Sequence, residues 1–398
     1  MRKICMRNAT KASSPGAVVR RVKLSTFSFD SDRGWSVESF PALDSPQTLV
    51  IVFGGAEFLG APERLTELVS AYPSSVVVGC SSAGEIHGAH ISDDSLSVAV
   101  VRFERGTLRQ ARTEVASGGS SRSAGAVLGR ELASPDLRAV FVLSDGISVN
   151  GTELLTGIHG AVDRSVAVTG GLAGDGSRFR QTWVLAGGKP TSGIVVAVGL
   201  YGDSIGVSHG SRGGWDAFGP ERVVTKSVGN VLHALDDEPA LALYKTYLGE
   251  RAEGLPATAL LFPLALRAAS SAQTVVRTVL SVDEASQTMT FAGDIPEDSI
   301  VQLMRANFDR LIDGASKASE AATLPGSGDS LTVAVSCVGR RLVLGERAEE
   351  EVEAALEGVT DNGKMIGFYS YGEISPFAPG ECGVLHNQTM TLTRFWER

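Results

Sequence analysis

Residues 48–80 read TLVIVFGGAEFLGAPERLTELVSAYPSSVVVGC, and this stretch decides the fold class. Residues 48–54 form a β-branched, apolar run that is typical of a buried strand, and residues 74–80 form a second such run. Between them, residues 61–72 place their apolar side chains at helical spacing. A strand, a helix and a strand in this order indicate an α/β arrangement.

The rest of the first half continues this alternation and adds antiparallel pieces. Two strand patterns, 95–104 and 107–115, flank the turn Arg105-Gly106 and predict a β-hairpin. Further predicted elements are a helix at 122–133, a strand at 139–145, a helix at 151–162 and short strands between glycine-rich turns over 192–234. We therefore expect a mixed rather than a purely parallel sheet.

The second half opens with a helix that ends at Gly249. It is predicted to contain helices at 238–249, 300–321 and 346–357 and strands near 273–281, 287–292, 331–337, 364–370 and 389–395. No repeat of fixed period is visible. The predicted fold class is α/β to α+β, with two domains that each contain a mixed, partly antiparallel sheet covered by helices.

The length of 398 residues favours two domains. The pattern of short strands and glycine-rich turns places their boundary near residue 225. We predict a flexible N-terminal tail at 1–19, a first module at 20–225 and a second module at 226–398.

Composition excludes several classes of partner. Acidic residues outnumber basic ones by 45 to 36, and this balance argues against nucleic acid, which attracts a basic face. The longest apolar stretch, residues 257–266, is half a membrane span and contains Pro263, so no membrane contact is expected.

The N-terminal 23 residues are basic but lack the apolar run of a signal peptide. The four cysteines are scattered, as suits a reducing compartment, so we expect a cytoplasmic protein. That location leaves the glycosylation sequon at Asn387 without a role.

The stretch GCSSAGEI, residues 79–86, follows the end of a predicted buried strand. Its small residues allow a sharp turn whose backbone amides can meet an anionic group of a ligand. Cys80 could instead be a nucleophile, but a thiol packed at a strand end is the simpler interpretation. The binding candidates from this stretch are Cys80, Ser81, Ser82, Gly84 and Glu85.

Three motifs in the second half supply further candidates. Arg340 follows a predicted strand and could hold a carboxylate of a ligand, although an ion pair with Glu350 or Glu351 explains it equally well. Glu373, in FYSYGEISP, could hold an amine, and we expect it to have a cationic or amide partner. The stretch HNQT at 386–389 either binds a ligand or closes a turn onto the last strand. The candidates are Arg340, Tyr371, Glu373, His386 and Asn387.

Two more patterns give no support for a phosphate-binding or metal-binding site. The glycine-rich stretch TGGLAGDGSRF, residues 169–179, lacks the spacing of a phosphate loop and is interpreted as a tight turn packed close to another backbone. The six histidines show no metal-binding spacing, so no metal site is predicted.

Taken in order, these motifs resemble those of the FIST proteins, with a FIST N-terminal module followed by a C-terminal one. The resemblance covers roughly residues 20 to 396. It is carried by GCSSAGEI, GGLAGD, the stretch 215–249, SCVGRRLVLG, YSYGEISP and LHNQTMTL.

The resemblance implies a sensory protein that binds a small molecule, such as an amino acid or a similar carboxylate-bearing metabolite, and that is not an enzyme. The output would pass through a separate signalling protein, such as a kinase or a cyclase. No cofactor is predicted, but some members bind haem and sense nitric oxide, and for a haem protein His209 is the candidate axial ligand. The chain could instead be an enzyme that uses Cys80 or the region of His386, or it could be an adaptor that binds only proteins. The alanine- and arginine-rich composition suggests a bacterial source.

Overall fold

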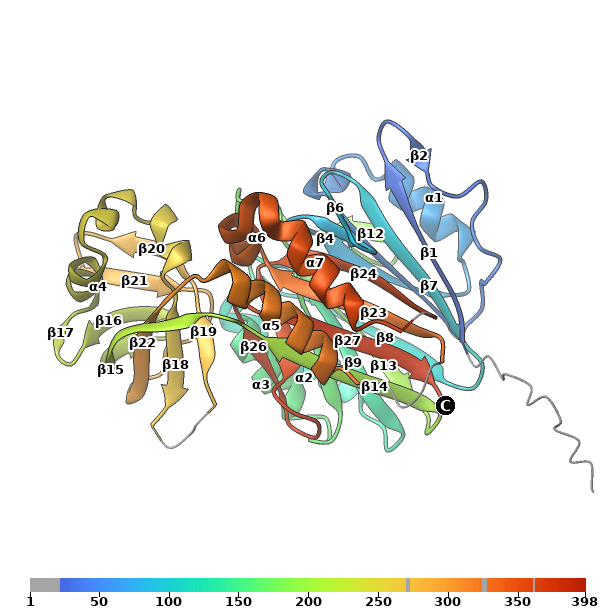
Figure 1. Ribbon diagram of the computed structural model, residues 1–398. Coiled ribbons are helices and arrows are strands. Elements are labelled where there is room, and N and C mark those ends of the chain that lie inside the picture. The colour runs from blue at the N-terminus through green and yellow to red at the C-terminus, as the bar shows by residue number, and fades with distance from the viewer. Residues whose placement is uncertain (1–21, 117, 270–272, 324–327, 361) are drawn as a thin grey trace, which may run out of the picture.

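The computed structural model describes residues 22–116, 118–269, 273–323, 328–360 and 362–398. These residues form a large body and a smaller lobe (Figure 1). We use lobe for the described part of residues 216–305 and body for all other described residues. The predicted tail, residues 1–19, lies outside the described residues.

The body is built from three sheets, which we call sheets 1, 2 and 3. Sheet 1 runs β12 (Lys189–Thr191), β11 (Val184–Ala186), β4 (Val76–Ser81), β3 (Thr48–Gly54), β7 (Leu96–Phe103), β1 (Val22–Asp30) and β2 (Gly34–Trp35). Sheet 2 runs β26 (Gly383–His386), β25 (Gly372–Pro376), β10 (Ala167–Leu172), β9 (Leu137–Ser144), β13 (Ile194–Tyr201) and β8 (Thr107–Glu114). Sheet 3 runs β14 (Ile205–Arg212), β27 (Met390–Glu397), β23 (Ser330–Cys337), β24 (Gly363–Ser370), β5 (Glu85–His87) and β6 (His90–Ser92).

The three sheets repeat one arrangement. Each has a parallel pair with at least one helix between its strands in the chain: β3 with β4, β9 with β10, and β23 with β24. The first strand of each pair lies antiparallel to β7, β13 or β27. That strand in turn lies antiparallel to β1, β8 or β14. The body therefore has a threefold structural repeat.

Each repeat also donates a hairpin to a neighbouring sheet. After β4, the chain forms β5 and β6, and β5 pairs with β24 of sheet 3. After β24, β25 and β26 form, and β25 pairs with β10 of sheet 2. After β10, β11 and β12 form, and β11 pairs with β4 of sheet 1. The three exchanges form a closed ring.

Apolar residues explain why the sheets meet face to face. The parallel strands are buried along nearly their whole length, as expected of a strand covered on both sides. Inside the body, Phe53 stacks on Phe368 with ring centroids 4.5 Å apart, and Phe141 meets Phe395 edge-on at 5.8 Å. These contacts join all three sheets in one central core.

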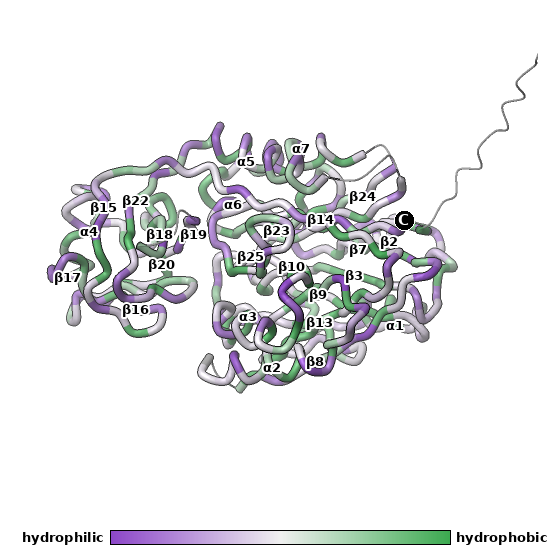
Figure 2. The backbone as a smooth tube through the Cα atoms, turned by 90° about the horizontal axis from the view of Figure 1, so that it is seen from below, coloured by the Kyte–Doolittle hydropathy of each residue, from purple (hydrophilic) through white to green (hydrophobic). Residues whose placement is uncertain are grey.

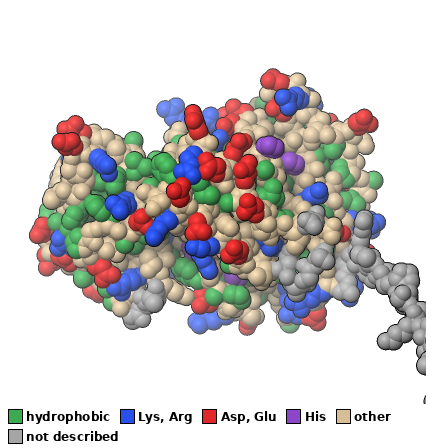
Figure 3. Space-filling view, viewed as in Figure 1, with side chains coloured by type: hydrophobic (Ala, Val, Ile, Leu, Met, Phe, Trp, Pro, Cys, Tyr) green, Lys and Arg blue, Asp and Glu red, His purple; other side chains and the backbone are tan. Residues whose placement is uncertain are grey.

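Helices cover the outer faces of the sheets. Figure 2 shows α5 and α7 on one side of the strands and α2 and α3 on the opposite side. The helices of the body are α1 (Glu63–Ala71), α2 (Ser121–Leu132), α3 (Gly151–His159), α5 (Phe308–Ala321), α6 (Val338–Leu344) and α7 (Ala348–Glu357). Acidic and basic side chains are interspersed over the face that carries α5 and α7 (Figure 3), where Arg347 pairs with both Asp309 and Glu350.

The lobe has its own sheet and its own core. Its sheet runs β19 (Val275–Arg277), β18 (Leu264–Ala268), β22 (Ser299–Arg305), β15 (Asp216–Val228), β16 (Val231–Leu235), β21 (Thr288–Phe291) and β20 (Val279–Asp283), with β17 (Glu238–Pro239) beside β16. One face packs on α4 (Ala240–Leu248), and Leu241, Tyr244 and Phe291 are among its buried residues. The lobe is inserted between β14 and α5 of the third repeat.

The predicted fold class, with mixed sheets covered by helices, is confirmed. The boundary predicted near 225 falls within β15 and stays a prediction. The hairpin predicted from residues 95–115 is wrong, because β7 and β8 belong to different sheets. The helix predicted at 300–321 is wrong over its first part, which forms β22, and correct from Phe308 onward.

Candidate functional site

Five of the predicted binding residues lie between the end of β4 and the start of β5. Cys80 is fully buried in the central core, and burial raises the pKa of its thiol well above the ordinary value. Ser81 is also buried, and its hydroxyl accepts a hydrogen bond from the Trp183 amide at 3.0 Å. A buried, protonated thiol is a poor nucleophile, so the geometry favours a packing role for Cys80.

The same turn places Glu85 at the start of the first exchanged hairpin. Gly84 has a positive φ of 137°, and a side chain there would overlap with the guanidinium of Arg341. The Glu85 carboxyl accepts hydrogen bonds from the amide and hydroxyl of Ser95 at 3.0 and 2.8 Å. Burial raises its pKa to about 8.

Ser82 and Glu85 line a small acidic cavity of about 290 Å³. The acids of this cavity already have partners in the protein. Asp93 pairs with Arg341 at 2.6 Å, and Asp94 hydrogen-bonds Glu57, which raises the pKa of Asp94. The carboxylates of Asp93 and Asp94 are therefore not free to pair with a ligand.

The turn after β24 repeats the chemistry of the turn after β4. Ser82-Ala83-Gly84-Glu85-Ile86 in the first repeat corresponds to Ser370-Tyr371-Gly372-Glu373-Ile374 in the third. The second repeat has Leu172-Ala173-Gly174-Asp175 at the same place. Each repeat thus ends its parallel pair with a glycine followed by an acid.

Glu373 is fully buried and satisfied by its own surroundings. It accepts hydrogen bonds from the Thr389 amide at 3.1 Å, the Thr389 hydroxyl at 2.9 Å and the Ser370 hydroxyl at 2.9 Å. The expected amide partner is therefore the backbone N–H of Thr389. Burial raises the pKa of Glu373 to about 8.

Arg340 points into the body rather than toward a cavity. Its guanidinium forms a buried ion pair with Glu351 and donates to the carbonyl oxygens of Gly213, Leu311 and Gln388. The sequence left open either a ligand carboxylate or an ion pair for Arg340, and the structure contains the ion pair.

His386 and Asn387 are also buried, where β26 turns toward β27. The His386 Nε2 bonds the Ser375 carbonyl oxygen at 2.9 Å, and burial lowers the pKa of the ring to about 4. The Asn387 amide donates to the His386 carbonyl oxygen at 3.0 Å, while its Oδ1 has no partner among the described residues. With Thr389 bound to Glu373, HNQT closes a turn.

The position of His209 does not fit haem. His209 lies within β14, opposite Thr393 of β27, and only 8% of the residue is exposed. Burial lowers the pKa of its ring. Neither the acidic cavity, nor the larger cavity described next, nor a small apolar cavity within the lobe is lined by a described histidine.

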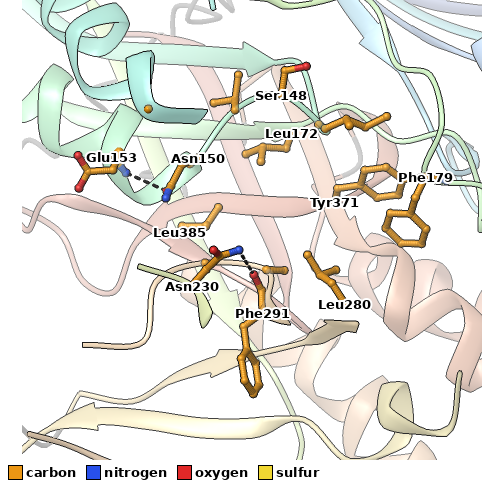
Figure 4. A pocket seen from close by; sticks show the side chains of 17 residues that line it. Ser148, Asn150, Glu153, Leu172, Phe179, Asn230, Leu280, Phe291, Tyr371 and Leu385 are labelled. Carbon is orange, nitrogen blue, oxygen red and sulfur yellow. Dashed lines mark hydrogen bonds between the residues drawn. The ribbon is translucent and has the colours of Figure 1, made fainter. Parts of the chain in front are cut away.

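The larger cavity, about 530 Å³, lies where the lobe meets the body (Figure 4). It opens at the carboxyl ends of β9 and β10, the edge at which α/β sheets usually bind ligands. Its volume is within the ordinary range for a small-molecule site. The lining side chains labelled in Figure 4 are Ser148, Asn150, Glu153, Leu172, Phe179, Asn230, Leu280, Phe291, Tyr371 and Leu385.

Tyr371 connects this cavity with the acidic one. Its ring stacks on Phe179 with centroids 4.3 Å apart, and its hydroxyl donates to the Asp175 carboxylate, which lines the acidic cavity. The Asp175 carboxylate also accepts hydrogen bonds from the backbone amides of Phe179, Arg180 and Gln181 at 2.8–2.9 Å. These bonds hold Phe179 at a φ of 51°, an unusual value for a bulky residue.

The polar edge of the larger cavity comes from α3 and from the lobe. Asn150 caps α3 by accepting the Glu153 amide at 3.2 Å, and its own amide donates to Asp294 of the lobe at 2.9 Å. Across the cavity, the Asn230 amide donates to the Phe291 carbonyl oxygen at 2.8 Å. The Glu153 carboxylate is paired with Arg122 at 2.7 Å.

Of the ten predicted binding residues, Ser82 and Glu85 line the acidic cavity and Tyr371 lines the larger one. The structure does not bring the ten together in one cleft. Phe179 ends the stretch 169–179, which the sequence indicates as a turn, and Leu280 lies in a predicted strand. Neither pattern indicates that the two residues line one cavity. Of the predicted turn TGGLAGDGSRF, residues 169–172 lie in strand β10, so the turn prediction is wrong there. The predicted close approach to another backbone is confirmed, since a side chain on Gly170 would overlap with Val142.

Two family models match this chain. The model of the FIST N domain matches residues 48–238, and the model of the FIST C domain matches residues 240–376. A comparison with curated proteins gave no match. Among the described residues, no helix combines the length and apolar character needed to cross a bilayer.

Proposed function

Since the chain belongs to the FIST family, whose domains are sensory, non-catalytic modules for small ligands in signal transduction, we propose that its larger cavity is the ligand site. The ligand is an amino acid or a similar carboxylate-bearing metabolite. The observation that carries this proposal is the convergence of exposed apolar side chains from the body and the lobe on a cavity with a polar edge.

The acidic cavity supports this role less well. Its carboxylates have partners within the protein, and a carboxylate-bearing ligand would meet like charge there. In the larger cavity, the N-terminal turn of α3 lies beside the neutral amides of Asn150 and Asn230, which suits a carboxylate.

The proposal includes an output through a separate protein, such as a kinase or a cyclase. Its basis is the sensory character of the two matched domains. A ligand that touches both the lobe and the body stabilises one arrangement of the two, and a partner protein could recognise that arrangement.

A thermal-shift screen tests whether the cavity binds a ligand. At about 100 times its dissociation constant, a compound that binds only the folded chain adds about 2.7 kcal/mol of stability. The melting temperature then rises by about 5–10 °C for a chain of this size. A library of amino acids and small carboxylates that produces no shift would contradict the proposal.

Two phenylalanines of similar exposure provide a test variant and a matched control for any compound that binds in the screen. Phe179 lines the cavity and is 43% exposed, whereas Phe308 lies on α5 and is 41% exposed. Phe179→Ala should weaken binding roughly 5- to 10-fold, since the apolar contact contributes about 1–1.5 kcal/mol. Phe308→Ala should leave the dissociation constant unchanged, and equal effects of the two would place the ligand elsewhere.

A further inference from the structure

Exposed apolar side chains gather at the larger cavity. Of the large hydrophobic residues that are exposed in the described chain, Ile147, Phe179 and Leu280 line it, with exposures of 45%, 43% and 43%. Ile147 follows β9, Phe179 follows β10, and Leu280 lies in β20 of the lobe. Contiguous exposed apolar surface of this kind marks a binding site.

Phe179 is 43% exposed although its ring is stacked. The ring stacks on Tyr371 with an interplanar angle of 13°. Figure 4 shows Leu280 of the lobe close to this stacked pair. The stack and Leu280 together offer an apolar slot with one wall from the body and one from the lobe.

The described charges around the slot do not suit a charged group. Glu153 is the only charged side chain among the described residues that line the cavity, and it is paired with Arg122. The amides of Asn150 and Asn230 belong to the polar edge of the cavity, where the proposed carboxylate binds, and not to the slot. A charged group in the slot would lose its hydration without gaining a partner. An apolar group would lose nothing and would cover the exposed surface of Phe179 and Leu280.

We propose that the ligand carries an aromatic or similarly bulky apolar group, which sits between Phe179 and Leu280. This inference rests on the proposed function of the same cavity. It predicts that aromatic amino acids and their analogues are preferred over small or acidic ones with the same head group.

The experiment compares L-phenylalanine, L-leucine, L-alanine and L-glutamate by titration calorimetry on the full chain. L-Phenylalanine should bind at least about tenfold more tightly than L-alanine, because only its side chain fills the slot. L-Leucine should lie between them, and L-glutamate should bind no better than L-alanine.

Two variants assign the preference to the slot. Phe179→Ala should reduce the ratio of affinities for L-phenylalanine and L-alanine to roughly threefold or less, and Phe308→Ala should preserve it. Leu280→Ala should act in the same direction as Phe179→Ala. Its control is Val228→Ala, at an exposed lobe residue outside the cavity.

The outcomes separate this inference from the proposed function. If L-alanine or L-glutamate binds as tightly as L-phenylalanine and Phe179→Ala weakens all of them alike, the slot preference is wrong while the cavity remains the site. If all four amino acids and the carboxylate library fail to bind, both are wrong. A preference that survives Phe179→Ala and Leu280→Ala also overturns the inference.

Discussion

At the scale of single residues, the two glutamates of the GEI motifs, Glu85 and Glu373, are buried in the body. Glu85 and Glu373 stand at equivalent places in two repeats, and each accepts hydrogen bonds from a residue just before the strand that follows the hairpin. These residues are Ser95 before β7 and Thr389 before β27. Burial raises the pKa of both to about 8. Each is therefore mostly protonated at neutral pH and acts as a hydrogen-bonding group in the turn.

The first prediction concerns the pH dependence of stability. The unfolded chain releases the Glu373 proton near pH 4.5 and the folded chain near pH 8, so the folded state holds more protons in between. The free energy of unfolding should therefore fall as the pH rises toward 8. Urea denaturation at several pH values measures this, and Glu373→Gln should remove part of the slope, on the order of a few kcal/mol in total.

Burial of His386 makes the free energy of unfolding depend on pH in the opposite direction, over a lower pH range. Burial lowers the pKa of His386 to about 4, so the unfolded chain binds more protons below its ordinary pKa of 6.5. Stability contributed by neutral His386 is lost on acidification. The comparison for Glu373→Gln is thus best made from pH 6.5 to 8, and a slope there that equals that of the unaltered chain would contradict the assignment. Ligand affinity should not change.

The second prediction concerns Arg340. Arg340→Met leaves the Glu351 carboxylate buried without its ion pair, which should lower the free energy of unfolding by about 3–5 kcal/mol. Arg347→Met removes exposed pairs with Asp309 and Glu350 and should cost less than about 1 kcal/mol. Urea denaturation of both variants gives the comparison, and similar small losses would mean that Arg340 is not a structural cation.

At the scale of elements, each parallel pair depends on a glycine. A side chain on Gly79, Gly170 or Gly367 would overlap with the carbonyl oxygen of Val52, Val142 or Ala334 in the adjacent strand. The second strand of each pair therefore lies unusually close to the first at this point. The three glycines hold comparable places in the three repeats.

The third prediction tests this close approach. Gly367→Ala should destabilise the fold by about 1–3 kcal/mol or more, because neither backbone can move without disturbing the core. Gly328→Ala is the control, since its new methyl group meets no atom within 4 Å. Thermal melting of the two variants should differ accordingly, and an unaffected Gly367→Ala would show that the strands can separate.

The sequence predicts elements better than their partners. The apolar runs at 48–54, 139–145 and 331–337 are strands, because burial on both faces requires continuous apolar side chains. The pattern at 95–115 predicts a hairpin because neighbours in sequence usually pair, yet β7 and β8 belong to different repeats. The alternation Val301, Gln302, Leu303 could have revealed β22, since its burial also alternates.

At the scale of the whole molecule, several polar contacts attach the lobe to the body, among them the ion pair of Asp216 with Arg310 and the hydrogen bond from Asn150 to Asp294. Arg277 of the lobe donates to the Leu385 carbonyl oxygen at 3.1 Å, and Gln388 donates to Thr278 at 3.0 Å. The lobe has a core of its own, and its Val276 also packs with Leu311 and Val343 of the body. The larger cavity lies along this contact.

The fourth prediction is that occupancy of the cavity stabilises the docked lobe. With saturating L-phenylalanine, amide hydrogen exchange should slow at residues 147–153 of the body and also in β20 and β21 of the lobe. The same measurement with Phe179→Ala is the control. Protection confined to the body would show that the lobe takes no part in binding.

Only part of the candidate site could be predicted from the sequence, because the residues that line it are far apart in the chain. Tyr371 is predicted as a binding residue because its motif carries an acid, whereas Phe179 ends a stretch that indicates only a turn and Leu280 lies in a predicted strand. Their proximity depends on how the inserted lobe docks on the body. The threefold repeat was missed because the three turns share little more than a glycine and an acid.

The ring of exchanged hairpins has a consequence for synthesis on the ribosome. The hairpin β5–β6 is complete at Ser92, but its partner β24 begins only at Gly363. A nascent chain that has emerged as far as the lobe therefore presents an unpaired strand edge with no sheet to join. Such edges attract other chains. We therefore expect the nascent chain to expose this edge until its third repeat has left the exit tunnel.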